Sequence, residues 1–433
     1  MQWREGEIIR AVREWPGAVE YAVRLRSAPP SPSADPTSPP RLIAQDSQAS
    51  ASEDANPAQS DAETGQAREG SEVRALAYTA MVGRPELGDR VVLNASALLK
   101  GLGTGGLAFV VAVPDRLPAD PPPSEGHIVK ARYTPQQQMF LAVDEQDSPH
   151  HATLREADSL DGMPVVVADL HSALPAVVAG VRLARPDARV AYVMTDGGAL
   201  PIAFSRAVAG LKDAGWLAET VTVGQAFGGD HEAVSLHSGL LAARHVVDAD
   251  VVVVAQGPGN VGTGTPWGYS GVAAADALHA VHVLGGTGIA SLRVSGADPR
   301  PRHRGISHHS TTAYGKALLS PALVPVPAPG LQAAQAPEPM HEPEPAHEPA
   351  GDPVTGVGRR GDELYALVRE QARDLAESSR AELEVVEVGT DGVLDALRGS
   401  PVGLSTMGRS LDEDPAPFVA AAVAGILAAE RAD

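Results

Sequence analysis

Short runs of alternating hydrophobic and polar residues occupy the first part of the chain. This alternation predicts strands, because successive side chains of a strand point to opposite faces. Gly and Pro separate the runs, which is typical of turns, so the pattern predicts a small antiparallel β-barrel or sandwich. The runs lie at 7–12, 18–25, 73–78, 90–93 and 107–113.

From Met163 onward the chain repeats a different unit: a short apolar strand, a Gly-rich polar loop and an Ala/Leu/Val-rich helical stretch. Strands that alternate with helices imply parallel pairing, so the pattern predicts an α/β fold with a doubly wound, mostly parallel sheet. An α/β barrel is less favoured, since eight such units are not visible. The expected strands are 164–168, 189–194, 220–223, 250–255 and 289–294, and the expected helices are 173–184, 202–213, 234–247, 270–284 and 311–318.

Composition changes along the chain predict its domains. The last segment has one strand and two or three helices, a thin core by itself, so we expect it to dock on the α/β domain. The predicted parts are a β-rich module at 1–117 with a disordered insertion at 27–71, a linker and connecting segment at 118–162, the α/β domain at 163–320, a disordered Pro/Glu-rich linker at 321–360, and an α/β appendage at 361–433.

The 433 residues contain no cysteine and carry a net charge of -20. The missing cysteine excludes disulfides, thiolate metal sites and a cysteine nucleophile. Residues 331–433 contribute a net charge of -12, whereas residues 124–320 contribute only -4. The acidity argues against nucleic-acid and membrane partners. No apolar run is long enough to span a bilayer and no signal peptide is recognised, so we expect a cytoplasmic protein. A homo-oligomer is left open.

Each expected strand of the α/β domain is followed by an unusual polar loop. In open parallel sheets, ligands bind outside the carboxyl ends of the strands, so these loops should converge on one edge. Turn and helix-capping roles explain such residues in any single loop. Five loops in succession that also contain His, Thr and Arg favour a functional cleft. The loops are 169–172, 195–201, 224–232, 256–270 and 295–310.

The fourth loop contains a Gly-x-Gly-x-x-Gly pattern that formally matches the dinucleotide fingerprint. Pro258 interrupts it, and the helix expected at Ser270 begins only eight positions after its last glycine. An anion-binding loop made of backbone N–H groups and hydroxyls fits better. An Arg-rich segment from Arg293 would hold the anion from the opposite side. The predicted ligand-binding residues are Gly257, Gly259, Asn260, Gly262, Thr263, Thr265, Arg302 and Arg304.

Twelve of the 14 histidines lie between residues 127 and 309, several of them beside carboxylates. This favours either acid–base catalysis or a divalent metal such as Zn, Mn or Mg. No established zinc spacing is present, so the cofactor is left unknown. The candidate catalytic residues are Asp169, His171, Asp196, Asp230, His303 and His308, and the alternative metal ligands are His150, His171, His308, His309 and Asp169.

Nine motifs together resemble the bacterial domain-of-unknown-function family 3866. The resemblance covers most of the chain outside 27–71 and 331–358, and it implies no substrate and no catalytic assignment. The motifs are GDRVVLN, VKARYTPQQ, DEQDSPHH, DLHSALP, YVMTDGGALP, GQAFGGD, GPGNVGTGT, RHRGISHHS and STMGRSLDEDP.

These features favour a hydrolase or transferase that acts on a small phosphate- or carboxylate-bearing molecule at the carboxyl edge of the sheet. The first alternative is a non-catalytic sensor or regulatory protein that binds a small molecule. The second is an NAD(P)-dependent oxidoreductase, which would require the glycines at 257–262 to open a helix directly.

Overall fold

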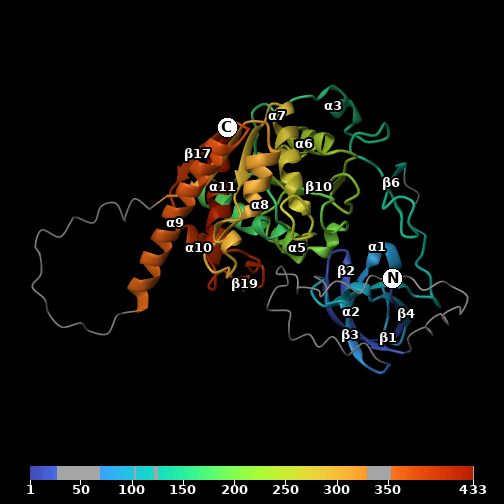
Figure 1. The fold of residues 1–433 in the computed structure, drawn as a ribbon. Helices are drawn as coiled ribbons and strands as arrows, with labels where there is room; N and C mark the ends of the chain where they lie inside the picture. The colour runs from blue at the N-terminus through green and yellow to red at the C-terminus, as the bar shows by residue number, and fades with distance from the viewer. Residues whose placement is uncertain (27–68, 102–103, 121–124, 329–352, 433) are drawn as a thin grey trace, which may run out of the picture. The chain divides into compact units, whose positions relative to one another are not determined.

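Two compact units, residues 1–123 and 124–433, make up the chain in the computed structural model (Figure 1). The structure describes all residues except 27–68, 102–103, 121–124, 329–352 and 433. Most of the predicted insertion at 27–71 and most of the predicted linker at 321–360 therefore lie outside the described residues.

The first unit is a closed β-barrel with the strand order β1-β2-β3-β5-β4. The long β1 pairs with both β2 and β4, which closes the barrel, and β3 and β5 pair in parallel. Its core is formed by the apolar positions that alternate along the strands. The predicted β module is therefore confirmed as a barrel. Its elements are β1 (Trp3–Trp15), β2 (Ala18–Leu25), β3 (Glu72–Tyr78), α1 (Thr79–Val82), β4 (Arg90–Asn94), α2 (Ser96–Leu99) and β5 (Leu107–Ala112).

In the described part of the second unit, eight strands form one parallel sheet in the order β11-β10-β9-β12-β8-β13-β16-β17. The central strands β8, β9 and β12 are buried along almost their whole length, as expected for a sheet covered on both faces. The predicted doubly wound α/β fold is confirmed. The strands are β8 (Pro164–Ala168), β9 (Val190–Thr195), β10 (Glu219–Thr222), β11 (His231–Glu232), β12 (Val251–Gln256), β13 (Thr287–Ser291), β16 (Ala322–Pro327) and β17 (Leu383–Val388).

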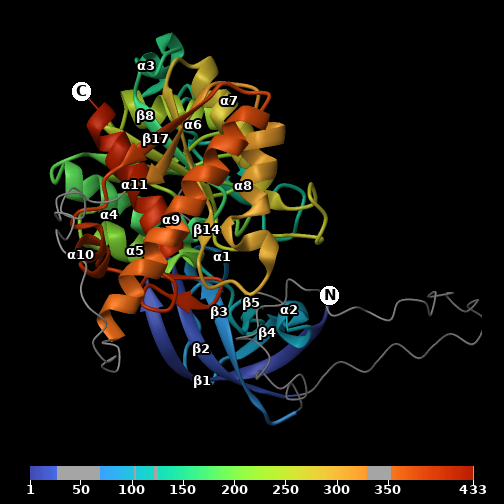
Figure 2. The same ribbon diagram turned by 60° about the vertical axis from the view of Figure 1, so that its left-hand side comes forward.

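Helices cover the two faces of this sheet, and each face has its own apolar core. Figure 2 shows α4 and α10 on one side and α7 and α8 on the other. The first face carries α4 (Leu174–Ala184), α5 (Arg206–Asp213), α10 (Val393–Arg398) and α11 (Ala416–Arg431). The second face carries α3 (His151–Glu156), α6 (Leu236–His245), α7 (Ala274–Val283), the α8 segment (His308–Thr312) and α9 (Pro353–Ser378).

Strand β16 lies inside the segment predicted as a linker, so that boundary is wrong for residues 322–327. The two prolines of β16 misled the prediction, because proline cannot donate a ladder hydrogen bond. Pro325 and Pro327 are two residues apart, so both missing N–H groups face β13, with which β16 pairs only at Leu323. The alternate residues pair with β17 along the whole strand. The C-terminal segment therefore extends the sheet through β17.

The segment predicted to connect the two domains, 118–162, contains the hairpin of β6 (Ile128–Lys130) and β7 (Gln138–Phe140) as well as α3. Lys130, which is 1% exposed, fastens this hairpin to the edge of the sheet. Its Nζ donates to the carbonyls of Thr222 and Ala226, at 3.0 and 2.8 Å, and to Glu232 Oε2 at 2.7 Å. These bonds satisfy the buried ammonium group of Lys130, so we assign the Lys130–Glu232 ion pair a structural role.

Helix α11 packs on α4 through two glycines. A Cβ atom at Gly180 would lie 1.9 Å from the carbonyl oxygen of Ala422, and one at Gly425 would lie 2.0 Å from that of Val177. Each helix therefore brings its backbone against the other, and most of α11 is buried. Although α11 is strongly apolar, no helix in the described ranges is long and apolar enough to span a membrane.

We predict that Gly180→Ala destabilises the second unit by about 1–3 kcal/mol, because the added methyl must push the helices apart. The direction of this change is diagnostic, because replacing glycine with alanine inside a helix normally stabilises the helix. Urea denaturation followed by circular dichroism measures the change. Gly389→Ala is the matched control, because no atom lies within 4 Å of its added Cβ. Equal midpoints for Gly180→Ala and wild type would contradict the proposed helix contact.

Candidate active site

The carboxyl ends of the parallel strands meet at one edge of the second unit. The chain leaves β8 toward α4 on the first face, but it leaves β12 and β13 toward helices on the second face. Such a divergence opens a crevice beside the central strand, the usual position of ligand sites in this fold class.

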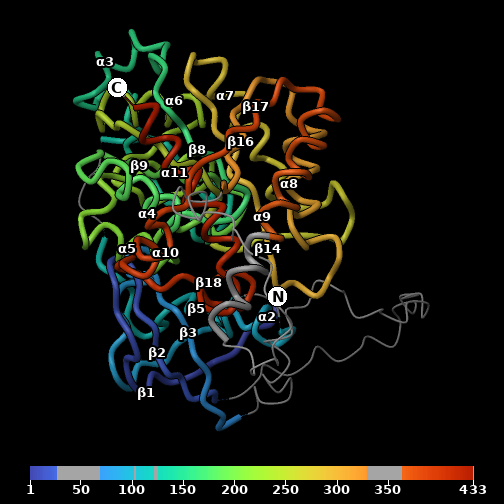
Figure 3. The backbone as a smooth tube through the Cα atoms, turned by 90° about the vertical axis from the view of Figure 1, so that its left-hand side faces the viewer, coloured from blue at the N-terminus to red at the C-terminus, as the bar shows by residue number. Residues whose placement is uncertain are grey.

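A pocket lies between the ends of β8 and β13. Its volume is about 540 Å³ when the open solvent at its mouth is included. Its floor is the end of these strands, and its walls come from β14 (Val294–Ser295), the 298–307 loop and the N-terminus of α11. The hairpin of β18 (Ser405–Thr406) and β19 (Arg409–Ser410) completes it. Figure 3 shows β14 and β18 at the same end of the unit. Segments more than 200 residues apart in sequence thus share one pocket.

Asp169 follows β8 directly and lines this pocket, with 3% of its surface exposed. Its Oδ2 atom accepts no hydrogen bond from any described residue. The nearest cation is Arg293, with Nη1 3.9 Å from Oδ2. Burial raises the pKa of the Asp169 carboxyl, and Arg293 offsets part of the rise. A carboxyl group in this setting is suited to holding and donating a proton.

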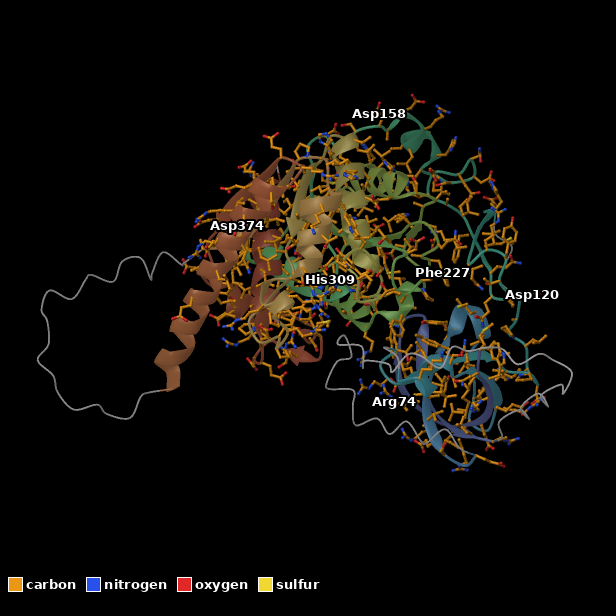
Figure 4. The ribbon with its side chains drawn as sticks, in the orientation of Figure 1. Arg74, Asp120, Asp158, Phe227, His309 and Asp374 are labelled. Carbon is orange, nitrogen blue, oxygen red and sulfur yellow. The ribbon has the colours of Figure 1, made fainter. Side chains whose placement is uncertain are left out.

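Arg293 is itself nearly buried, with a side chain 10% exposed. Its Nη1 donates to Nδ1 of His309 at 2.6 Å, which fixes the neutral tautomer of that ring with the proton on Nε2. Burial, followed by Arg293, lowers the pKa of His309 to about 2. The ring of His309 also stacks on Tyr269, with centroids 4.2 Å apart. Figure 4 shows His309 among the side chains clustered at this end of the unit.

His303 lines the same pocket and is 3% exposed. Nδ1 lies 2.8 Å from Ser307 Oγ, whereas Nε2 is buried and has no partner among the described residues. Burial, followed by the charge of Arg293, lowers the pKa of His303 to about 4. The ring is therefore neutral near pH 7, with an unpartnered nitrogen available for acid–base work.

A π-helical turn, residues Ala313–Ala317, follows α8 directly. Such turns are frequent at functional sites. Here the turn places the buried Tyr314, whose hydroxyl donates to the carbonyls of Val167 and Ser291. Tyr314 thereby ties the ends of β8 and β13 together beneath the pocket.

The β18–β19 hairpin holds Arg409 at the pocket. Its two turn residues, Met407 and Gly408, both have positive φ angles of 51° and 76°. This geometry is that of a tight two-residue hairpin turn. Arg409 Nη2 lies 3.3 Å from Asp298 Oδ2 and Nε lies 3.4 Å from Asp414 Oδ2. The hairpin is thus fixed by charges on both sides.

The structure places His171 in a buried network outside this pocket. Nδ1 lies 3.0 Å from the Tyr192 hydroxyl and Nε2 lies 2.7 Å from Ser205 Oγ. Burial lowers the pKa of His171 to about 4. Both ring nitrogens are already partnered, so this geometry supports a packing role instead of the predicted catalytic one.

Asp196 and Asp230 are exposed and occupy turns. Asp196 Oδ2 accepts from the backbone N–H of Gln225 at 2.9 Å. Asp230 Oδ2 accepts from the backbone and hydroxyl of Thr220, and Oδ1 pairs with Lys212. These bonds account for both carboxylates as turn-forming residues, and neither lines the pocket.

The Gly-rich loop folds back on itself instead of opening a helix. Gly262 pairs with Tyr269, Thr263 N donates to the carbonyl of Gly268, and the Thr263 and Thr265 hydroxyls lie 3.1 Å apart. The arrangement required by the NAD(P) alternative is therefore not present in this loop. Gly257 serves close packing, because a Cβ there would lie 2.2 Å from the carbonyl oxygen of Ala199. Residues 259–267, including Gly259 and Asn260, are exposed.

Three of the predicted residues lie beside His303 in sequence or space but do not line the pocket. His308 lies with its ring centroid 4.8 Å from His303, Arg302 is half-buried, and Arg304 is exposed. His150 lies elsewhere, against His231 of β11. Within the described ranges, no group of three or more His, Asp or Glu residues is arranged to hold a metal ion. The geometry therefore gives the metal alternative no support.

Sequence reasoning missed three contributors to the pocket. Arg293 was recognised in the basic segment but not selected as a ligand-binding residue, and the roles of Ser307 and Arg409 were not foreseen. Ser307 could have been found from its position between His303 and His308. Arg409 gives no local signal, because only the path of the chain through β17 and α10 returns it to the pocket.

The sequence profile of a family described as "Protein of unknown function (DUF3866)" matches residues 74–425. The match spans most of the chain, so the chain belongs to this family, and the resemblance seen in its motifs is confirmed. The matched range runs from β3 to α11 and includes every pocket residue discussed above. No curated protein and no solved structure matches the chain.

We predict that lowering the pH from 7.5 to 5 destabilises the protein in part through His171. The folded pKa of about 4 lies below the ordinary value of 6.5. The unfolded chain therefore binds a proton in this window that the folded chain does not, which costs about 2 kcal/mol at pH 5. Urea midpoints at both pH values measure the loss.

The variant His171→Gln should lose less stability on acidification than wild type, because glutamine does not titrate. His237→Gln is the control, since His237 is exposed on α6. An identical pH dependence in wild type and His171→Gln would rule out this source of acid sensitivity.

Proposed function

We propose that this DUF3866 protein is a hydrolase or transferase that acts on a small phosphate- or carboxylate-bearing molecule in the pocket between β8 and β13. One observation carries the proposal. Asp169 Oδ2 and His303 Nε2 are both buried and unpartnered among the described residues, and both residues line the same pocket. An unsatisfied buried polar atom is costly, so two of them in one pocket favour a ligand that satisfies them.

The pKa shifts of the two groups suit acid–base catalysis. The pKa of Asp169 is raised and that of His303 is lowered to about 4. Carboxyl and imidazole groups with pKa values displaced in this way are typical of acid–base pairs. In this proposal the Nδ1–H of His303 donates to Ser307, and Nε2 accepts the proton of the attacking water or hydroxyl. Asp169 then donates a proton to the leaving group.

Arg293 supplies the positive charge for the anion. Among the described residues, its guanidinium contacts with His309 and Asp169 use only Nη1. Nε and Nη2 can therefore bind a carboxylate or phosphate. Because the neighbouring histidines are neutral, Arg293 and Arg409 are the cations that line the pocket.

We predict that His303→Gln and Asp169→Asn each lower turnover at least about 100-fold, the scale of a lost proton-transfer group. A panel of phosphate monoesters and carboxylic esters identifies a substrate of the wild type, and steady-state kinetics then compares the variants. His237→Gln and Asp276→Asn are matched controls, because both residues are exposed. Full turnover in both site variants would refute the catalytic assignment. Binding of anions without any turnover would favour the sensor alternative.

A further inference from the structure

A second pocket lies on the opposite side of Asp169, at the carboxyl ends of β8 and β12. Its volume is about 240 Å³ when the open solvent at its mouth is included. Thr195, Gln256 and Ser270 contribute to its walls. Asp169 lines both pockets, so it forms the wall between them. The proposed function uses only the first pocket, which leaves the chemistry of the second unexplained.

Gln256 presents an unsatisfied acceptor at this second pocket. The residue is 5% exposed, and its Nε2 donates to the backbone carbonyl of Asp169 at 3.0 Å and to Asn260 Oδ1 at 3.4 Å. These two acceptors fix the orientation of the amide. Oε1 is buried without a partner among the described residues. A buried carbonyl oxygen of this kind requires a hydrogen-bond donor, and none of the described side chains supplies one.

Gly197 packs directly against this oxygen. A Cβ atom at Gly197 would lie 2.5 Å from Gln256 Oε1. The φ angle of Gly197 is not positive, so the backbone itself does not require glycine. The absence of a side chain at this position therefore leaves room for the buried Oε1 atom.

The spacing of the strands limits what can reach both pockets. Strands β12 and β13 flank β8, so their ends are two strand spacings apart, roughly 10 Å. Gln256 ends β12, and Arg293 follows β13 by two residues. A ligand that contacts both must carry its anionic group and its donor group several bonds apart.

We propose that Gln256 forms a second subsite that binds a hydroxyl or amino group of the same small anionic molecule. The substrate class is then an organic acid or phosphate with a hydroxyl or amino group several bonds from the anion. This inference rests on the proposed function, because Arg293 holds the anionic end. Gln256 determines specificity and takes no part in proton transfer.

Matched probe pairs test the subsite with the full chain. Ligand-observed NMR titrations measure the Kd of 4-hydroxybutyrate against butyrate, and of glycerol 3-phosphate against propyl phosphate. Each pair differs in its hydroxyl groups, and the two pairs distinguish a carboxylate from a phosphate anion. We expect the hydroxylated member of at least one pair to bind about tenfold more tightly, the effect of one buried hydrogen bond.

Two variants locate the effect at Gln256. Gln256→Met removes Oε1 with little change in size, and Gly197→Ala narrows the space beside it while keeping the amide. Both should reduce the hydroxyl preference to about onefold while the unsubstituted probe keeps its Kd. Gln225→Met is the matched control, because Gln225 is exposed and absent from the second pocket. If Gln256→Met fails to fold, Gly197→Ala still decides the question.

The failures of the two proposals are distinguishable. Equal affinities within both pairs overturn the subsite alone, since the anion still binds and water then satisfies Oε1. A hydroxyl preference that survives in both variants also overturns it. If no probe binds, or if Arg293→Met leaves binding of butyrate and propyl phosphate unchanged, the anion site itself is wrong and both proposals fall.

Discussion

The carboxyl group of Asp169 is buried at the end of the central strand, 3.9 Å from one guanidinium and without a hydrogen-bond donor on Oδ2 among the described residues. Ionising a carboxyl group buried in this way costs several kcal/mol, which is why burial raises the pKa of Asp169. The cost is tolerable only because β8 is held on every side. It pairs with β12 and β13, and α4, α7 and α11 cover its faces. The packing around β8 therefore stabilises the polar pocket at its end.

The same burial sets the character of the histidines. Arg293 occupies the position of the cation beside Asp169, so a second positive charge nearby is disfavoured. His303 and His309 respond by remaining neutral, and His309 accepts a hydrogen bond from the arginine. His309, which the sequence offered as a metal ligand, is in this structure a neutral ring that accepts a hydrogen bond from a guanidinium.

Regular patterns in the sequence predicted the central fold well. Residues 164–168 were predicted as a strand with the observed bounds of β8, because all five are apolar and Gly162 and Asp169 flank the run. Strand β16 was not predicted, because its prolines are typical of a linker. In the structure these prolines face β13, with which β16 pairs only at Leu323. Sequence patterns indicate local preferences, whereas the formation of β16 depends on its pairing with β17, which is distant in sequence.

The sequence predicted a pocket residue only where that residue lies in a loop directly after a predicted strand. Asp169 was found in this way, and His303 was found within the fifth loop. His171 follows the same rule and yet packs against Tyr192 and Ser205, which no local pattern could reveal. Arg409 reaches the pocket from a distant hairpin.

The charges at the pocket link anion binding to proton binding. Asp169 and Asp298 balance Arg293 and Arg409 along its walls, and the histidine ring that lines it is neutral. An anion that enters adds negative charge beside Asp169 and His303, which favours the protonated form of each. Binding therefore raises the affinity of both groups for protons, so the anion favours a protonated Asp169 carboxyl and makes His303 a stronger base. In the proposed function, the charge-balanced pocket is therefore prepared for acid–base catalysis only when its ligand is present.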